Sequence, residues 1–256
     1  MPWNPEQYLQ FEAERAAPFV DLLALVRVRP SLRVIDLGCG TGELTRRLAD
    51  ALPDSSVLGV DNSPEMLARA AGLVRPGLAF AERSIEATLA GAEQWDLVFS
   101  HAAIQWVPDH ATLVPALLGL VAPGGQLAVQ LPSNQDHLTH RLIHTLAGEE
   151  PFRSALGGWT RQVPVLGLVA YADLLYHAGG RDLTVFEKIY PHVLAEADAL
   201  AEWTRGTALV PYLERLPPEL HEPFLDRYRA ALRAQWPTGP VFYGFRRTLF
   251  AATRPV

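Results

Sequence analysis

The 256-residue chain has 49% hydrophobic and 20% charged residues, which is ordinary for a globular protein. Its formal net charge of -6 excludes the overall basic surface that nucleic acid or an anionic membrane attracts. A single cysteine excludes an intramolecular disulfide, and no apolar run approaches the roughly 20 residues of a membrane span. Because the N-terminus also lacks a secretory pattern, we expect a reduced, soluble, cytoplasmic protein that binds neither nucleic acid nor membranes.

The first half of the chain alternates between amphipathic segments and short apolar runs. Residues 8–26 place apolar side chains at helical intervals, and Pro30 ends that segment. Strands are predicted at 33–37, 56–60, 78–81, 95–100 and 126–131, and helices at 43–52, from Ser63-Pro64 onward, and at 113–120. This alternation is typical of an α/β fold with a parallel sheet, helices on both faces, and a ligand at the carboxyl edge of the strands.

The alternation stops after Leu131. Residues 135–170 are predicted to be irregular, 182–193 and 241–253 to be strands, and 196–236 to be largely helical. We interpret the late helical block as a substrate lid inserted before the last strand of a doubly wound, mostly parallel, seven-stranded sheet. The predicted organisation is an N-terminal helical cap (1–30), a cofactor-binding core (31–134), an irregular segment with a late core strand (135–194), a helical lid (195–240) and a final core strand (241–256).

A glycine-rich turn, Asp36-Leu37-Gly38-Cys39-Gly40-Thr41-Gly42, joins the first predicted strand to the next helix. Alternate glycines let the backbone approach a ligand closely, and the helix presents its N-terminal N–H groups to it. A dinucleotide-binding turn requires a third glycine where this chain has Glu43, and an acidic residue is unfavourable beside a pyrophosphate. S-adenosylmethionine (SAM) has no phosphate, and its cationic groups suit a carboxylate such as Asp36. The turn therefore favours SAM over NAD.

Asp61 ends the second predicted strand, near where an acidic side chain accepts hydrogen bonds from ribose hydroxyls. The alternative is a turn or cap residue before Pro64. With the glycine turn upstream, we favour the ligand role.

Cys39 and three histidines are weaker candidates for chemistry. Cys39 has no histidine partner nearby in sequence, and we expect a small side chain packed under the turn. His137, His140 and His144 have helical spacing but no acidic or cysteine partner, so a polar helix face is favoured and no metal is predicted.

With the glycine turn, Asp61 and Pro123-Gly124-Gly125, the chain resembles the class I SAM-dependent methyltransferases. It further resembles the trans-aconitate 2-methyltransferase family along its whole length, in Trp3-Asn4-Pro5, Gln105-Trp106-Val107-Pro108-Asp109-His110, Gln130-Leu131-Pro132, Tyr190 with His192, Trp203 and Pro211-Tyr212-Leu213. The resemblance implies methyl transfer from SAM to one carboxylate of trans-aconitate, giving a monomethyl ester and S-adenosylhomocysteine. A carboxylate is already anionic at neutral pH, so no general base is needed and catalysis rests on positioning.

The resemblance also implies two sets of binding residues. The cofactor set is Tyr8, Arg15, Asp36, Gly38, Gly40, Gly42, Asp61, Asn62, Met66, Ser84, Ile85, Ser100, His101 and Trp106. The set for a small polycarboxylate, chosen as arginines and hydrogen-bond donors, is Gln105, Asn134, Arg161, Tyr171, Arg205, Tyr212, Tyr243, Arg246 and Arg247. Each of these arginines and tyrosines has the alternative role of a solvated surface charge or a half-buried tyrosine, and we favour that role for any single arginine except Arg246-Arg247, which lie inside an aromatic strand. The sequence departs from the family pattern at Ser84, His101, Val210 and Glu187-Lys188-Ile189.

Three alternatives remain at this point: a methyltransferase acting on another small metabolite, an NAD-dependent oxidoreductase, and a SAM-binding protein without catalysis. The glycine spacing and Glu43 argue against the oxidoreductase. The turn does not identify the methyl acceptor.

Overall fold

The computed structural model describes residues 12–256, with side chains from residue 17 onward. Seven strands form one sheet in the order β3-β2-β1-β4-β5-β7-β6. Strands β1 to β5 are parallel, and β7 runs antiparallel between β5 and β6. The strands are β1 (Arg33–Leu37), β2 (Ser56–Asp61), β3 (Leu78–Glu82), β4 (Trp95–His101), β5 (Val121–Pro132), β6 (Arg181–Leu194) and β7 (Val241–Thr253). The predicted seven-stranded, mostly parallel α/β fold is confirmed.

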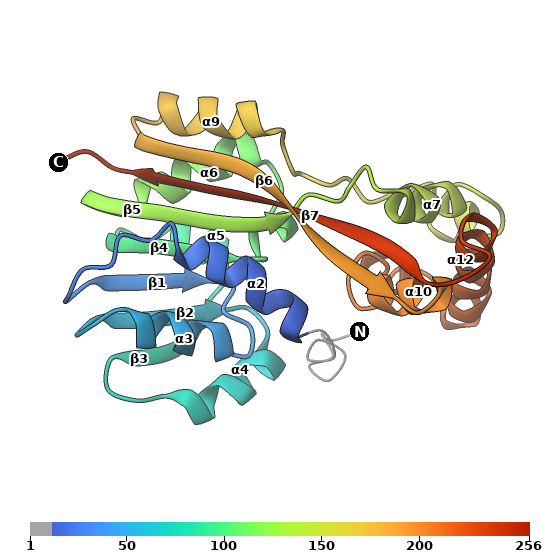
Figure 1. The fold of residues 1–256 in the computed structure, drawn as a ribbon, viewed down its shortest axis with the longest axis horizontal. Coiled ribbons are helices and arrows are strands. Elements are labelled where there is room, and N and C mark those ends of the chain that lie inside the picture. Colours follow the sequence, from blue (N-terminus) through green and yellow to red (C-terminus); the bar gives the residue numbers. More distant parts are fainter. Residues whose placement is uncertain (1–11) are drawn as a thin grey trace.

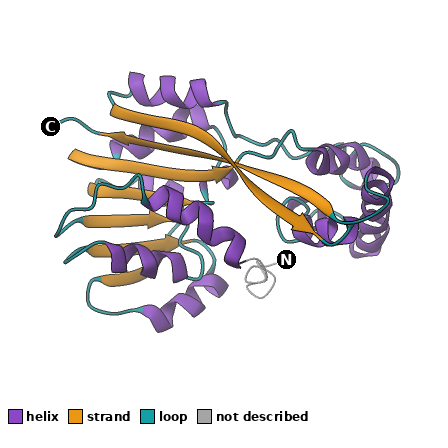
Figure 2. Ribbon diagram, in the orientation of Figure 1, coloured by secondary structure: helices purple, strands orange, loops and turns teal. Residues whose placement is uncertain are grey.

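Helices cover both faces of the sheet and form a separate group at one end (Figures 1 and 2). The α-helices are α2 (Glu12–Leu23), α3 (Glu43–Ala51), α4 (Pro64–Ala70), α5 (Ile85–Leu89), α6 (His110–Gly119), α7 (Leu138–Ala147), α8 (Phe152–Ala155), α9 (Leu168–His177), α10 (Ala197–Arg205), α11 (Val210–Leu213) and α12 (His221–Gln235). Short 3-10 turns are η1 (Ala71–Leu73), η2 (Ile104–Trp106) and η3 (Pro218–Leu220). No helix in the described part of the chain is both long and apolar enough to cross a membrane.

The alternation of side chains along β1 explains the two layers. Val34 packs with Phe19 and Leu48 in the cluster beneath α2 and α3, whereas Ile35 and Leu37 belong to the opposite cluster, with α6 and α9. Four of the five β1 residues are buried, as expected for a central parallel strand covered on both sides. Because β1 pairs with both β2 and β4 in parallel, the carboxyl ends of these three strands meet at one edge of the sheet.

The helical block predicted to be a substrate lid contains more helices than the sequence indicated, and we call the whole block the lid. A second hydrophobic cluster joins residues of α7 and α8 to α10, α11 and α12 and to the outer ends of β6 and β7. Figure 1 shows β6 and β7 leaving the sheet as a twisted ribbon that carries this lid. Residues 135–170, predicted to be irregular, thus contain α7, α8 and the start of α9. These helices are short and separated by Gly148, Pro151 and Gly157, which conceals their periodicity in a longer window.

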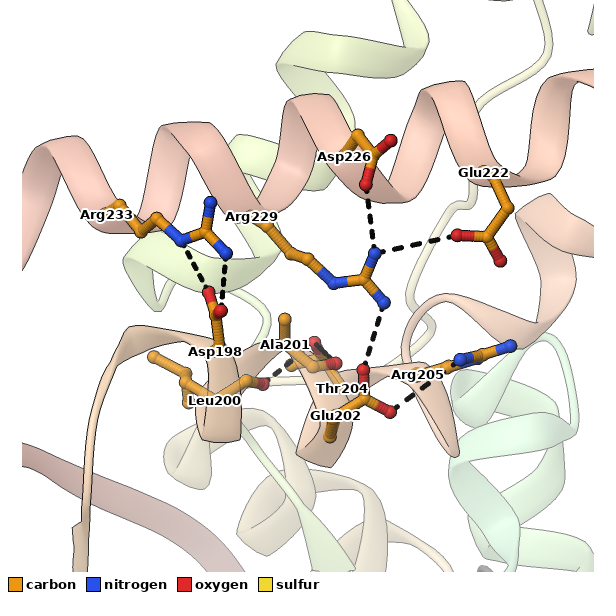
Figure 3. Close-up of polar contacts among 10 residues, drawn as sticks. All are labelled: Asp198, Leu200, Ala201, Glu202, Thr204, Arg205, Glu222, Asp226, Arg229 and Arg233. Carbon is orange, nitrogen blue, oxygen red and sulfur yellow. Dashed lines mark hydrogen bonds and ion pairs between the residues drawn. The ribbon is translucent and has the colours of Figure 1, made fainter.

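Charged pairs link α10 to α12 within the lid (Figure 3). Arg229 lies 3.1 Å from carboxylate oxygens of both Glu202 and Asp226. Arg233 binds Asp198 with both Nε and Nη2. Each exposed pair contributes only about 0–1 kcal/mol, so the buried apolar cluster provides most of the stability of the lid.

Candidate active site

The glycine turn and Asp61 form one hydrogen-bonded unit at the carboxyl edge of β1 and β2. The backbone N–H of Gly40 donates to Oδ2 of Asp61 at 2.8 Å, and the N–H of Ser63 donates to Oδ1 at 2.9 Å. Asp61 therefore stabilises the turn, which was the alternative to a ligand-binding role in the sequence analysis. A carboxylate has about four acceptor sites, so this unit leaves capacity for a ligand.

A pocket opens beside this unit, and we call it the cofactor pocket. Its lining includes nine residues of the predicted cofactor set: Gly38, Gly40, Asp61, Asn62, Met66, Ser84, Ile85, His101 and Trp106. The remaining lining residues, which sequence reasoning missed, are Ser63, Arg83, Glu86, Ala102, Ala103 and Val107. Most of these residues directly follow a predicted site residue in sequence, so including the neighbours of each predicted residue would have identified them.

Three predicted cofactor residues lie beneath the pocket and do not line it. Asp36 is buried, accepts a hydrogen bond of 2.6 Å from Oγ1 of Thr45, and has its pKa raised to about 7 by burial. Gly42 lies against Phe80, and Ser100 donates to the carbonyl oxygen of Leu37 at 2.9 Å. Asp36 and Gly42 thus lie on the buried side of the turn, and Ser100 bonds the turn at Leu37. Tyr8 and the side chain of Arg15 lie outside the described residues.

Cys39 is buried in the turn, and burial raises the pKa of its thiol. This matches the expected packing role. His137 caps the N-terminus of α7, whereas His140 and His144 line a chamber described below. Within the described residues, no group of three or more His, Cys, Asp and Glu side chains is placed to hold a metal.

A second pocket, which we call the acceptor pocket, adjoins the cofactor pocket on the lid side. Ala102 and Trp106 line both. The predicted substrate residues in its lining are Gln105, Asn134, Arg161, Tyr243 and Arg247. The others are Pro132, Gln135, His140, Val163, Trp203, Thr207, Ala208 and Phe245. The core and the lid both contribute walls, so the pocket exists only when the two are assembled.

Arg161 is the most informative side chain of the acceptor pocket. Its guanidinium lies 4.2 Å from the centre of the Trp106 ring, and Nη2 is 3.4 Å from the carbonyl oxygen of Gln105. Among the described residues, no carboxylate lies within 4.0 Å of it. Burial lowers the pKa of Arg161, but an arginine in a protein keeps its charge. A half-buried guanidinium without a carboxylate partner has N–H groups that can donate charge-assisted hydrogen bonds to an anionic ligand.

Other polar groups of the acceptor pocket are fixed by hydrogen bonds. Nδ2 of Asn134 donates to the Tyr243 hydroxyl at 3.1 Å, and the side chain of Asn134 also accepts from the backbone N–H of Arg246. Arg247 is 5% exposed and lies 4.7 Å above the Phe245 ring. Burial lowers the pKa of His140 to about 4, so this histidine is neutral at neutral pH.

Four predicted substrate residues do not line the acceptor pocket. Arg246 points to the other face of β7, 3.8 Å from carboxylate oxygens of Glu187 and Asp136. Arg205 lies on the lid surface, 3.8 Å from Glu202 (Figure 3). Tyr171 is buried in the core.

The fourth, Tyr212, lines the adjoining chamber. Its hydroxyl accepts a hydrogen bond from the backbone N–H of Arg161 at 3.2 Å. Tyr212 therefore positions the segment that carries Arg161.

Comparison with known proteins agrees with this arrangement. A family model described as "Methyltransferase domain" matches residues 34–125. Two solved structures share the fold: the YcgJ protein from Bacillus subtilis (TM-score 0.62, 13% identity, 94% of this chain and 99% of that chain), and Haemonchus contortus phosphoethanolamine N-methyltransferase 2 in complex with S-adenosyl-L-methionine (TM-score 0.55, 17% identity, 94% and 53%). The fold and the pocket at the strand edge define a class I SAM-dependent methyltransferase.

Curated relatives narrow the class. A trans-aconitate 2-methyltransferase from Deinococcus radiodurans is 49% identical over 100% of this chain and 99% of its own length. One from Variovorax paradoxus is 42% identical over 93% and 91%. The chain belongs to the trans-aconitate 2-methyltransferase family. The resemblance inferred from the sequence is confirmed, whereas the roles of individual site residues stay predictions.

Replacing Asp61 with alanine is expected to weaken binding of S-adenosylhomocysteine by roughly 1–3 kcal/mol. The change removes the carboxylate predicted to accept from ribose hydroxyls, and it also leaves the N–H groups of Gly40 and Ser63 without their partner. Titration calorimetry measures the effect. Asp173→Ala, which removes an exposed carboxylate on α9, is the control. Unchanged affinity in the Asp61 variant would remove this residue from the site.

Replacing Tyr171 with phenylalanine is expected to destabilise the fold by roughly 1–3 kcal/mol and to leave methyl transfer unchanged. The fully buried hydroxyl lies 2.6 Å from Nδ1 of His110 and accepts from the backbone N–H of Leu166, so its loss leaves two groups unpaired. Denaturant unfolding and acceptor kinetics separate the two effects. Tyr176→Phe, on the exposed side of the same helix, is the control. A stable variant with impaired kinetics would return Tyr171 to the substrate set.

Proposed function

We propose that this chain transfers the methyl group of SAM to one carboxylate of trans-aconitate, giving the monomethyl ester and S-adenosylhomocysteine. The observation that carries the proposal is the half-buried guanidinium of Arg161, which has no carboxylate partner among the described residues and lies in a pocket adjoining the cofactor pocket. The names of the Deinococcus and Variovorax relatives support trans-aconitate as the acceptor.

The residues of the cofactor pocket fit SAM. Gly40 has φ +56, and a Cβ atom built there would meet no atom within 4 Å, so the bare backbone faces open space at the pocket. We assign the ribose hydroxyls to the carboxylate of Asp61 and the adenine to the wall that Ser84 and Ile85 form. When bound, SAM supplies a methyl group on a positively charged sulfur.

The residues of the acceptor pocket hold and orient the acid. Arg161 and Arg247 offer guanidinium groups to the carboxylates that are not methylated, and Asn134 and Tyr243 provide a fixed polar wall. The reacting carboxylate oxygen forms the new bond to the methyl carbon while the carbon–sulfur bond breaks. No proton moves, so no side chain has to act as a base.

Positioning supplies the rate enhancement. Holding two reactants in line contributes up to roughly 7–11 kcal/mol. The lid covers one side of the acceptor pocket with Trp203, Thr207 and Ala208, which limits the access of water while opposite charges neutralise. We also propose the cap, core and lid boundaries inferred from the sequence, with α7 and α8 added to the lid because their residues belong to its hydrophobic cluster.

Incubation with SAM labelled in the methyl group, and with a panel of di- and tricarboxylic acids, tests the proposal. We expect transfer to trans-aconitate with the highest kcat/KM of the panel, and a base-labile ester product. Transfer to amines or phenols with none to any acid would refute the carboxylate acceptor. Binding of NAD without binding of S-adenosylhomocysteine would refute the methyltransferase.

A further inference from the structure

A third cavity, which we call the outer chamber, continues from the acceptor pocket towards the surface of the lid. It is lined by Gln135, His140, Arg141, Ile143, His144, Thr145, Arg161, Val163, Ala208 and Tyr212. Five of these residues, Gln135, His140, Arg161, Val163 and Ala208, also line the acceptor pocket. None of them lines the cofactor pocket. The acceptor pocket is thus bordered by two spaces, one for the cofactor and one leading to the lid surface.

One face of α7 forms the outer wall of this chamber. His140 and His144, like Arg141 and Thr145, are four residues apart and therefore adjacent on the helix. Arg141, His144 and Thr145 are exposed, whereas His140 and Arg161 lie deeper. The chamber therefore opens to solvent at α7 and narrows towards Arg161.

The charge of the outer chamber suits an anion. Neither Arg141 nor Arg161 has a carboxylate within 4.0 Å among the described residues, whereas Arg153, Arg229 and Arg233, all on lid helices, are ion-paired. No described Asp or Glu lines the chamber. The chain has a net charge of -6, but Arg141 and Arg161, which have no carboxylate partner in the described part of the chain, place two positive charges at successive depths of the chamber.

We propose that the carboxylate acceptor enters, and the ester product leaves, through the outer chamber, with Arg141 as the first carboxylate contact and Arg161 as the second. SAM exchanges separately through the cofactor pocket. This inference rests on the proposed function, because it requires a polycarboxylate acceptor. It assigns to Arg141, and to the exposed face of α7, a role in acceptor capture that is separate from the reaction itself.

Arg141→Gln tests the electrostatic part of the proposal. We expect kcat/KM for trans-aconitate to fall about 5- to 10-fold at low ionic strength and the difference to shrink at 0.5 M salt, because screening weakens steering by exposed charges. kcat and the affinity for S-adenosylhomocysteine should stay within 2-fold of wild type. Arg69→Gln is the matched control, since Arg69 is also an exposed helical arginine that forms no ion pair with a described residue, and it lines none of the three cavities.

Thr145→Trp tests the route itself. Thr145 is exposed at the mouth, so a large side chain there narrows the chamber without disturbing the core. We expect a lower kcat/KM for the acceptor and unchanged affinity for S-adenosylhomocysteine. Acceptor kinetics equal to wild type in both variants would refute the proposed route but not the proposed function. Loss of affinity for S-adenosylhomocysteine in either variant would also refute the route. A wild-type enzyme that methylates no carboxylic acid would instead refute the proposed function.

Discussion

Replacing Gly40 with alanine is expected to abolish measurable SAM binding while leaving most of the stability of the fold. Gly40 has φ +56, so an alanine there costs about 1–2 kcal/mol in backbone strain. A Cβ atom at this position would meet no protein atom within 4 Å, and Gly40 lines the cofactor pocket, so we expect the added methyl group to occupy space that the ligand needs. Calorimetry with S-adenosylhomocysteine and denaturant unfolding measure the two quantities.

Gly38→Ala is the matched comparison in the same turn. Its Cβ atom would lie 2.2 Å from Cβ of Ala103, and its φ of +76 adds backbone strain. We expect a loss of roughly 2–5 kcal/mol of stability together with the loss of binding. Comparing the two variants distinguishes Gly40, where a side chain would occupy ligand space, from Gly38, where a side chain would collide with Ala103. If Gly40→Ala bound S-adenosylhomocysteine as wild type does, the assignment of this pocket to the cofactor would be wrong.

The cofactor half of the site could be predicted because its signals are local. The turn, its flanking strand and Asp61 lie within 30 residues, and parallel strands bring their carboxyl ends to one edge whatever the rest of the chain does. The sequence did not show which residues of this edge line the pocket and which lie buried beneath it. Asp36 and Ser100 lie on the correct strands but beneath the pocket, where they bond Thr45 and the carbonyl oxygen of Leu37.

The acceptor half depends on long-range packing, and its prediction was correspondingly weaker. Arg246 and Arg247 are neighbours in sequence, but successive residues of a strand point to opposite faces. The register of β7 against β5 and β6 decides that Arg247 lines the pocket and that Arg246 faces Glu187. Trp203 was one of the residues that resemble the family, but nothing in its chemistry predicted a place in the site. It lines the pocket because the lid packs against the core.

Replacing Arg161 with methionine is expected to lower kcat/KM for trans-aconitate by roughly 100-fold or more, as when one partner of a buried, hydrogen-bonded charge pair is lost. The fold should not lose comparable stability, because the change removes a half-buried cation that has no carboxylate partner among the described residues. We expect unfolding free energies within about 1 kcal/mol of wild type, the lost contact with Trp106 being of that size. Acceptor kinetics and denaturant unfolding test the two statements together.

Arg161→Lys distinguishes charge from shape at this position. Lysine keeps the positive charge but not the planar fork that binds a carboxylate through two hydrogen bonds, so we expect kcat/KM between those of wild type and Arg161→Met. Affinity for S-adenosylhomocysteine should change little in either variant, because Arg161 does not line the cofactor pocket. Acceptor kinetics within a few-fold of wild type in Arg161→Met would contradict the role of this residue. The substrate carboxylates would then have to be bound through Arg247, whose guanidinium lies on the core side of the same pocket.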